Sequence, residues 1–146
     1  MISDKTNRDK KDTSFVCDAI VSNLSLLQEK IDEFLEGIEI SKTSATRLKM
    51  IAEEFFVNIA SYAYPNGKGQ VRVSMSLEND PPAVKITFRD RGIPYNPLEA
   101  QKPDVTLGAE ERSIGGLGIY LSLKCADDVS YEYTGAENVL TFTKNL

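Results

Sequence analysis

Glu54 and Asn58 carry the side chains of this chain that are best suited to chemistry at a phosphate group. They are four residues apart in a stretch of helical hydrophobic period, so they should lie on one helix face, one turn from each other. A glutamate can accept a proton from a hydroxyl that attacks phosphorus, and an asparagine oxygen is a hard ligand for Mg²⁺. The pair predicts a magnesium–nucleotide site; a solvated polar helix face is the alternative.

Asp90 and Gly92 form a second candidate segment, which follows the alternating residues 84–88. A carboxylate at the end of a strand can accept a hydrogen bond from the exocyclic amine of adenine, which distinguishes adenine from guanine. Gly92 would let the backbone approach the base closely, and Ile93 with Pro94 would supply apolar walls. The segment indicates an adenine pocket, although an ordinary Asp-x-Gly turn has the same pattern.

A glycine-rich segment stands directly before the apolar residues 119–123. It consists of Gly115, Gly116, Leu117 and Gly118. Such backbone at the start of a helix can direct several N–H groups and the positive end of the helix dipole toward phosphates. No Gly-Lys-Ser/Thr follows, and no strand–turn–helix with a downstream acidic residue surrounds it, so neither a P-loop nor a Rossmann fingerprint is present. A flexible start to a helix remains the alternative.

The first helix that positions these segments is expected at residues 24–36, where apolar residues recur at helical spacing. Gly37 is a natural stop for it. Ser25 and Gln28 resemble a capping box at its start, and Ser22 or Asn23 are alternative caps.

The remaining elements follow from hydrophobic period and turn residues. We expect a helix at 41–64, strands at 13–20, 70–77, 84–88, 129–133 and 139–143, and a short helix at 117–125. Residues 93–111 have no clear period and read as a long loop of the kind that often serves as a lid. Helices early in the chain and an antiparallel meander late in it predict an α+β two-layer sandwich.

Composition narrows the functional class. A chain of 146 residues is most simply one domain, preceded here by a polar tail at residues 1–12. A net charge of −5 argues against a general nucleic-acid binder, because phosphate neutralisation needs a basic surface. Cys17 and Cys125 lack metal-ligand spacing and have no histidine to join them, which favours reduced thiols in a cytoplasmic protein. No apolar run approaches a membrane span.

Taken together, the three segments resemble the GHKL ATPase superfamily, and within it the bacterial anti-sigma-factor serine kinases. The resemblance covers about residues 13–146. Glu54 and Asn58 match the N box, residues 90–96 the first glycine box and residues 115–119 the second; residues 127–131 look like the start of the strand that follows. The combination is far more specific than any of its parts.

The resemblance implies a two-layer α/β sandwich of the GHKL (Bergerat) type, with a mixed, mostly antiparallel sheet covered by helices on one face. It implies ATP and Mg²⁺ as cofactors, Glu54 as general base and Asn58 as the Mg²⁺ ligand. Asp90 would read adenine, Gly92 and Ile93 would line the base pocket, and the glycines of 115–118 would hold the phosphates under a lid at about 97–114.

The resemblance also implies a function and partners. Members transfer the γ-phosphate of ATP to a serine of a small STAS-type anti-anti-sigma protein and sequester a sigma factor, usually as homodimers. This chain departs from the usual pattern at Tyr62, where a histidine is common, and at Glu137 and Asn138, where Gly-Thr is common. Asn138 is expected to replace the threonine as a polar contact to the base.

Three other functions stay open from the sequence. The catalytic half of a histidine kinase is disfavoured, because the chain has no histidine and no long dimerisation helix before the domain. A non-catalytic ATP-binding module would use the nucleotide only to hold a partner. A simple ATPase would release phosphate without a protein acceptor.

Overall fold

The computed structural model describes residues 11–99 and 116–146, in which five strands form one sheet. The strand order is β1-β2-β3-β5-β4, and each neighbouring pair is antiparallel. The strands are β1 (Asp12–Asp18), β2 (Gln70–Glu78), β3 (Ala83–Asp90), β4 (Asp128–Tyr133) and β5 (Asn138–Asn145). The helices are α2 (Leu24–Leu35), α3 (Lys42–Tyr62) and α4 (Gly116–Cys125), with the 3-10 helices η1 (Val21–Asn23) and η2 (Pro97–Glu99). The α+β expectation is confirmed, with a described sheet that is antiparallel rather than mixed.

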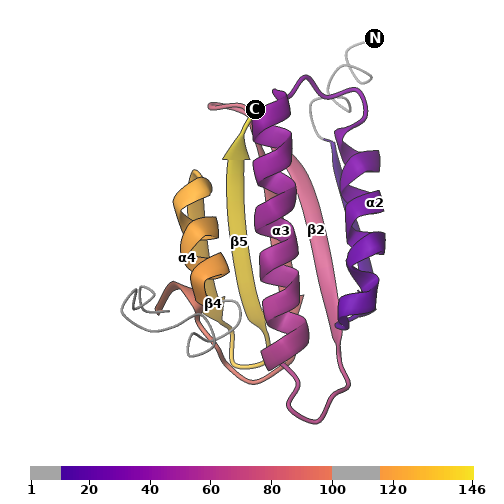
Figure 1. Ribbon diagram of the computed structural model, residues 1–146, viewed down its shortest axis with the longest axis vertical. Helices are drawn as coiled ribbons and strands as arrows, with labels where there is room; N and C mark the ends of the chain where they lie inside the picture. Colours follow the sequence, from indigo (N-terminus) through magenta and orange to yellow (C-terminus); the bar gives the residue numbers. More distant parts are fainter. Residues whose placement is uncertain (1–10, 100–115) are drawn as a thin grey trace.

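The helices α2, α3 and α4 lie on one face of the sheet, and α3 occupies the middle of this layer (Figure 1). Alternate residues of the strands point toward the helices and are buried, as period two requires. The Phe55 ring of α3 packs edge-on against Phe88 and Phe142, at centroid distances of 6.3 and 5.5 Å. Aromatic pairs of this geometry add to the energy of burial, so α3 is held firmly over β3 and β5.

The start of α3 is set by Ser41, whose Oγ accepts a hydrogen bond from the Ser44 N–H at 3.0 Å. This side-chain cap satisfies one of the unpaired N–H groups of the first turn. The helix then buries an apolar face that includes Leu48, Ile51 and Phe55. It ends at Tyr62, close to the expected boundary, before Pro65. Because α3 is packed along its length, the positions of Glu54 and Asn58 are fixed with it.

The capping box expected at Ser25 and Gln28 is wrong. The helix α2 begins at Leu24, so Ser25 already lies inside its first turn. Gln28 Nε2 instead donates to Glu53 Oε1 of α3 at 3.1 Å. Asn23 occupies the N-cap position, but its side chain donates to the Asp18 carbonyl at 2.8 Å and makes no cap bond. The side chains of Asn23 and Gln28 therefore bond to groups other than the N–H groups at the start of α2.

Several expected segments fall wholly or partly outside the described residues. β1 begins at Asp12, the last residue of the expected tail, and residues 1–10 are not described. Of the expected lid at 97–114, only residues 97–99 are described, as η2; residues 100–114 and Gly115 are not. None of the helices in the described ranges is long and apolar enough to cross a membrane.

The register of β3 and β5 prepares the candidate site. Asp90, the last residue of β3, stands directly opposite Asn138, the first residue of β5. On its other side, Asp90 pairs with Val71 of β2. Three strands therefore lie side by side at the end of the sheet that holds the carboxylate. The pairing of β3 with β5 brings Asp90 and Asn138 together although they are far apart in the sequence.

Candidate functional site

A cavity that is partly open to solvent lies between the C-terminal half of α3, the ends of β3 and β5, and α4. Its apolar walls include Phe55 and Ile59 of α3 and Ile119 of α4. Three buried polar side chains also line it, namely Asn58, Asp90 and Asn138. An apolar cavity with a few convergent polar groups is the usual form of a small-molecule site.

Asp90 is the carboxylate of this cavity and is only 4% exposed. Its Oδ1 atom accepts hydrogen bonds from the Gly92 N–H and from Asn138 Nδ2, both at 2.9 Å. Burial raises the pKa of Asp90, the two hydrogen bonds lower it, and the nearby Glu137 raises it again. Among the described residues, both hydrogen bonds fall on Oδ1. The Oδ2 atom therefore retains its capacity to accept a hydrogen bond from a ligand.

Gly92 is required by the packing of the loop that follows Asp90. A Cβ atom at this position would lie 2.2 Å from the Ala63 carbonyl oxygen at the end of α3. The neighbouring Ile93 N–H donates to the same oxygen at 2.8 Å. The close approach in the structure is thus to the end of α3, which is a reason for glycine besides the expected approach to a base. Ile93 itself lines the cavity, as expected for a wall residue.

Asn58 lies one turn after Glu54 on α3 and is 6% exposed. It lines the cavity, and its amide makes no hydrogen bond to another described residue. Since its side chain lines the cavity, the amide is available there to a ligand or an ion. The Asn58 oxygen therefore fits the role of a Mg²⁺ ligand. Within residues 11–99 and 116–146, no cluster of three or more His, Cys, Asp or Glu could hold a metal.

Glu54 has an unusual carboxylate environment. Its Oε1 atom is buried and has no hydrogen-bond partner among the described residues. Burial raises the pKa of this carboxyl above its ordinary value. The adjacent Glu53 differs, because it accepts the hydrogen bond from Gln28 on the side of α2. Glu53 therefore faces α2, while Glu54 faces the first turn of α4.

The first turn of α4 lies directly against Glu54. A Cβ atom on Gly118 would be 2.2 Å from Glu54 Oε1 and 2.4 Å from its Cδ. Glycine at 118 therefore makes room for the carboxylate. Gly116 and Leu117 are the first two residues of α4, so the glycine-rich segment does stand at a helix start.

Asn138 is held by the protein on every side, which the sequence did not indicate. Its Nδ2 group donates to Asp90 Oδ1 and to the Ile93 carbonyl, each at 2.9 Å. Its Oδ1 atom accepts from the Tyr95 N–H at 3.2 Å and from the Tyr131 hydroxyl. The residue lines the cavity, but its amide is fully engaged by other protein groups.

Sequence reasoning also missed the aromatic residues of the cavity. Tyr62, Tyr95 and Tyr131 all line it, and the rings of Tyr62 and Tyr95 lie 6.2 Å apart with an interplanar angle of 34°. Tyr62 and Tyr95 are about two-fifths exposed. Aromatic faces of this kind can stack on a nucleobase. Of these three residues, only Tyr95 had a local signal in the sequence, because it directly follows the expected wall residues Ile93 and Pro94.

Comparison with known proteins agrees with the fold and with the family that the motifs resemble. Residues 18–144 match the family described as "Histidine kinase-like ATPase domain". The chain is 25% identical over 115 residues to an anti-sigma F factor of Bacillus licheniformis, covering 78% of this chain and 77% of that protein. It is 26% identical over 116 residues to the serine/threonine-protein kinase BtrW of Bordetella bronchiseptica, covering 77% and 81%.

A solved structure gives the same architecture. The fold is similar to a crystal structure of the RsbU and RsbW domains of Rv1364c from Mycobacterium tuberculosis, with a TM-score of 0.64 and 17% identity. The match covers 93% of this chain and 32% of that one, so this chain spans about a third of the solved protein. The resemblance drawn from the motifs is confirmed by these matches, and the chain belongs to the histidine kinase-like ATPase domain family.

Proposed function

We propose that this chain is an ATP-dependent serine/threonine protein kinase that phosphorylates a small STAS-type anti-anti-sigma protein and also acts as an anti-sigma factor. Two of its relatives support this class, since one is an anti-sigma F factor and the other a serine/threonine-protein kinase. The observation that carries the proposal concerns Glu54, one helical turn from Asn58. Its Oε1 atom is buried and has no hydrogen-bond partner within residues 11–99 and 116–146, while Asn58 lines the cavity.

The cavity is assigned to the adenosine part of ATP. Asp90 would accept a hydrogen bond from the adenine amine through Oδ2, since its Oδ1 atom is already held by Gly92 and Asn138. Apolar walls and the rings of Tyr62 and Tyr95 would cover the faces of the base. A site that must satisfy a buried carboxylate discriminates strongly against a base that lacks the matching donor.

The phosphates are assigned to the side of the cavity where α3 and α4 meet. Asn58 would supply one oxygen to Mg²⁺, an ion that usually takes its other ligands from phosphates and water. Mg²⁺ would neutralise charge on the transferring phosphoryl group. The glycine-rich segment 115–118 would direct backbone N–H groups to the phosphates from the start of α4.

Glu54 is assigned as the general base. It would take the proton of the acceptor serine while the serine oxygen bonds to the γ-phosphorus and the bond from phosphorus to the ADP oxygen breaks. Burial already raises its pKa toward the working pH. A base is most effective when its pKa is close to that pH, so this environment strengthens Glu54 for the role.

The test is phosphoryl transfer from radiolabelled ATP to STAS-type proteins encoded in the same genome. Wild type should label one of them on serine or threonine, and Glu54→Gln should lower the rate by about 10²- to 10⁴-fold. Glu53→Gln is the matched control, because the neighbouring carboxylate contacts Gln28 instead. Transfer at the wild-type rate by Glu54→Gln would remove the assigned role.

Two outcomes of the same assay would favour the alternatives. Nucleotide-dependent binding of a STAS-type protein, with no transfer, would identify a non-catalytic switching module. Phosphate release at a useful rate without any acceptor would identify a simple ATPase.

A further inference from the structure

Asn138 has no hydrogen-bonding capacity left for a nucleotide. A side-chain amide has two N–H donors and an oxygen that accepts two bonds. Both donors are used, toward Asp90 Oδ1 and the Ile93 carbonyl at 2.9 Å each, with a longer 3.5 Å contact to the Gly92 carbonyl. Both acceptor positions are used as well, by Tyr95 and Tyr131. Direct contact with the base therefore does not explain this residue.

The partners of Asn138 also fix which way its amide faces. Asp90 Oδ1 and the Ile93 carbonyl can only accept, while the Tyr95 N–H can only donate. A flipped amide would set oxygen against oxygen at two places. With 5% exposure, the side chain is also shielded from water that could substitute for these bonds.

Four of the groups held by Asn138 belong to the residues that face the proposed base. We propose that Asn138 is a positioning residue for adenine recognition that acts through Asp90. Its donation to Oδ1 leaves Oδ2 to read the exocyclic amine, and its bonds to the Ile93 carbonyl and Tyr95 N–H hold two wall residues in place. This inference rests on the proposed binding of adenine nucleotides.

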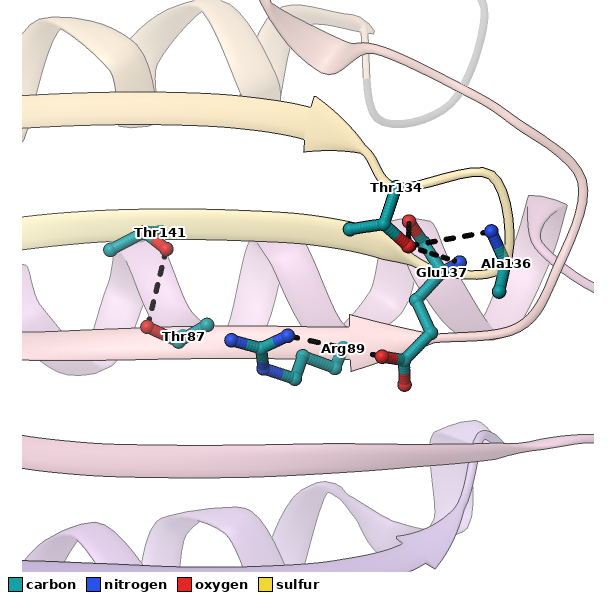
Figure 2. A network of polar contacts seen from close by, with 6 residues as sticks. All are labelled: Thr87, Arg89, Thr134, Ala136, Glu137 and Thr141. Carbon is teal, nitrogen blue, oxygen red and sulfur yellow. Dashed lines mark hydrogen bonds and ion pairs between the residues drawn. The ribbon is translucent and has the colours of Figure 1, made fainter.

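The start of β5 is itself braced on the far side of the sheet, which supports this role. Figure 2 shows the turn between β4 and β5, where Thr134 Oγ1 accepts from the N–H groups of Ala136 and Glu137 at 3.3 and 3.0 Å. Glu137 pairs with Arg89 of β3 at 3.8 Å. Because Arg89 and Glu137 directly precede Asp90 and Asn138, this ion pair links β3 to the start of β5 beside the key hydrogen bond.

The experiment compares ATP with purine riboside triphosphate, which lacks the exocyclic amine, by isothermal titration. Wild type should prefer ATP, and Asn138→Ala should lower this preference at least fivefold. A merely structural defect would weaken both nucleotides equally and leave their ratio unchanged. The ratio also does not depend on how much of the protein is folded. Asn138→Leu, which keeps about the same side-chain shape but makes no hydrogen bond, carries the same test if the alanine variant does not fold.

Two further variants complete the design. In an Asp90→Asn background, Asn138→Ala should change the preference less than twofold, because the reading carboxylate is already gone. Thr141→Val is the matched control on β5, since it loses the 3.2 Å hydrogen bond to Thr87 on the other face of the sheet (Figure 2). Its nucleotide preference should equal that of wild type.

The outcomes separate the two proposals. A wild-type protein that binds neither nucleotide would overturn the proposed function itself. A wild-type protein that prefers ATP, with an Asn138→Ala variant that keeps the full preference, would overturn the inference and leave the proposed function intact.

Discussion

Glu54 and Gly118 are packed so closely that a methyl group on Gly118 would lie 2.2 Å from Glu54 Oε1. This contact joins the middle of α3 to the first turn of α4. It explains why the carboxylate oxygen is buried and unpaired, since the backbone of α4 excludes water from it without offering a hydrogen bond among the described residues. The contact ties the proposed base to the start of the helix that follows the proposed lid.

Gly118→Ala should therefore impair catalysis. The added Cβ would force the Glu54 carboxylate or α4 to move, and misplacing a catalytic group by about 1 Å can cost about 10²-fold in rate. We expect the rate of phosphoryl transfer to fall on that scale in a single-turnover assay. Leu121→Ala, at a position of the same helix that is 48% exposed, is the control and should keep the wild-type rate. An unimpaired Gly118→Ala variant would contradict the contact.

Glu54→Gln should stabilise the nucleotide-free protein at neutral pH even though it removes the proposed base. A buried carboxylate oxygen without a partner costs free energy of about 1 kcal/mol or more, and an uncharged amide lowers that cost. The free energy of unfolding, measured in urea at neutral pH, should therefore rise by about 1 kcal/mol. Glu53→Gln is the control variant, and its free energy of unfolding should not rise.

The same stabilisation should depend on pH in a defined direction. Burial raises the folded-state pKa of Glu54 above its ordinary value of 4.5. The contribution of such a group to wild-type stability is full below the ordinary pKa and is lost as pH rises through the raised one. The gain in unfolding free energy from Glu54→Gln should accordingly be absent below pH 4.5 and should grow as the pH rises above that value. An advantage of equal size at all pH values would show that desolvation of the carboxylate is not its cause.

Gly92→Ala should destabilise the fold and weaken nucleotide binding together. Its Cβ would stand 2.2 Å from the Ala63 carbonyl oxygen, which is backbone and cannot easily move. Overpacking of this kind costs about 1–3 kcal/mol, measurable as a lower urea midpoint. Binding should weaken as well, because the Gly92 N–H holds Asp90 Oδ1. Ser61→Ala, exposed near the end of α3, should change neither quantity.

Much of the fold was predictable from local pattern. Alternation at Val71, Val73 and Met75 predicted β2, and a long apolar face at helical spacing predicted α3. In both cases, the local preference and the tertiary packing favour the same structure. The capping box at Ser25 was wrong because Gln28 has a partner on another helix. Local pattern cannot register that competition.

The residues of the candidate site could be proposed from the sequence, but the contacts between them could not. Glu54 and Asn58 are one turn apart by helix geometry alone, which the sequence contains. The approach of Gly118 to Glu54 and the hydrogen bond of Asn138 to Asp90 join residues more than 40 positions apart. Such contacts depend on strand register and helix packing, so the role of Asn138 could not be inferred before the fold was known.

The most direct test of the central claim is a titration of wild type and Asp90→Asn with ATP and GTP in the presence of Mg²⁺. A hydrogen bond to a charged group contributes about 1.5–3 kcal/mol, so Asp90→Asn should weaken ATP binding by roughly 10- to 100-fold. Wild type should bind ATP and discriminate against GTP, and the variant should lose that discrimination. Equal binding of ATP and GTP by wild type, or unchanged ATP binding by Asp90→Asn, would contradict the assignment of this cavity to adenine.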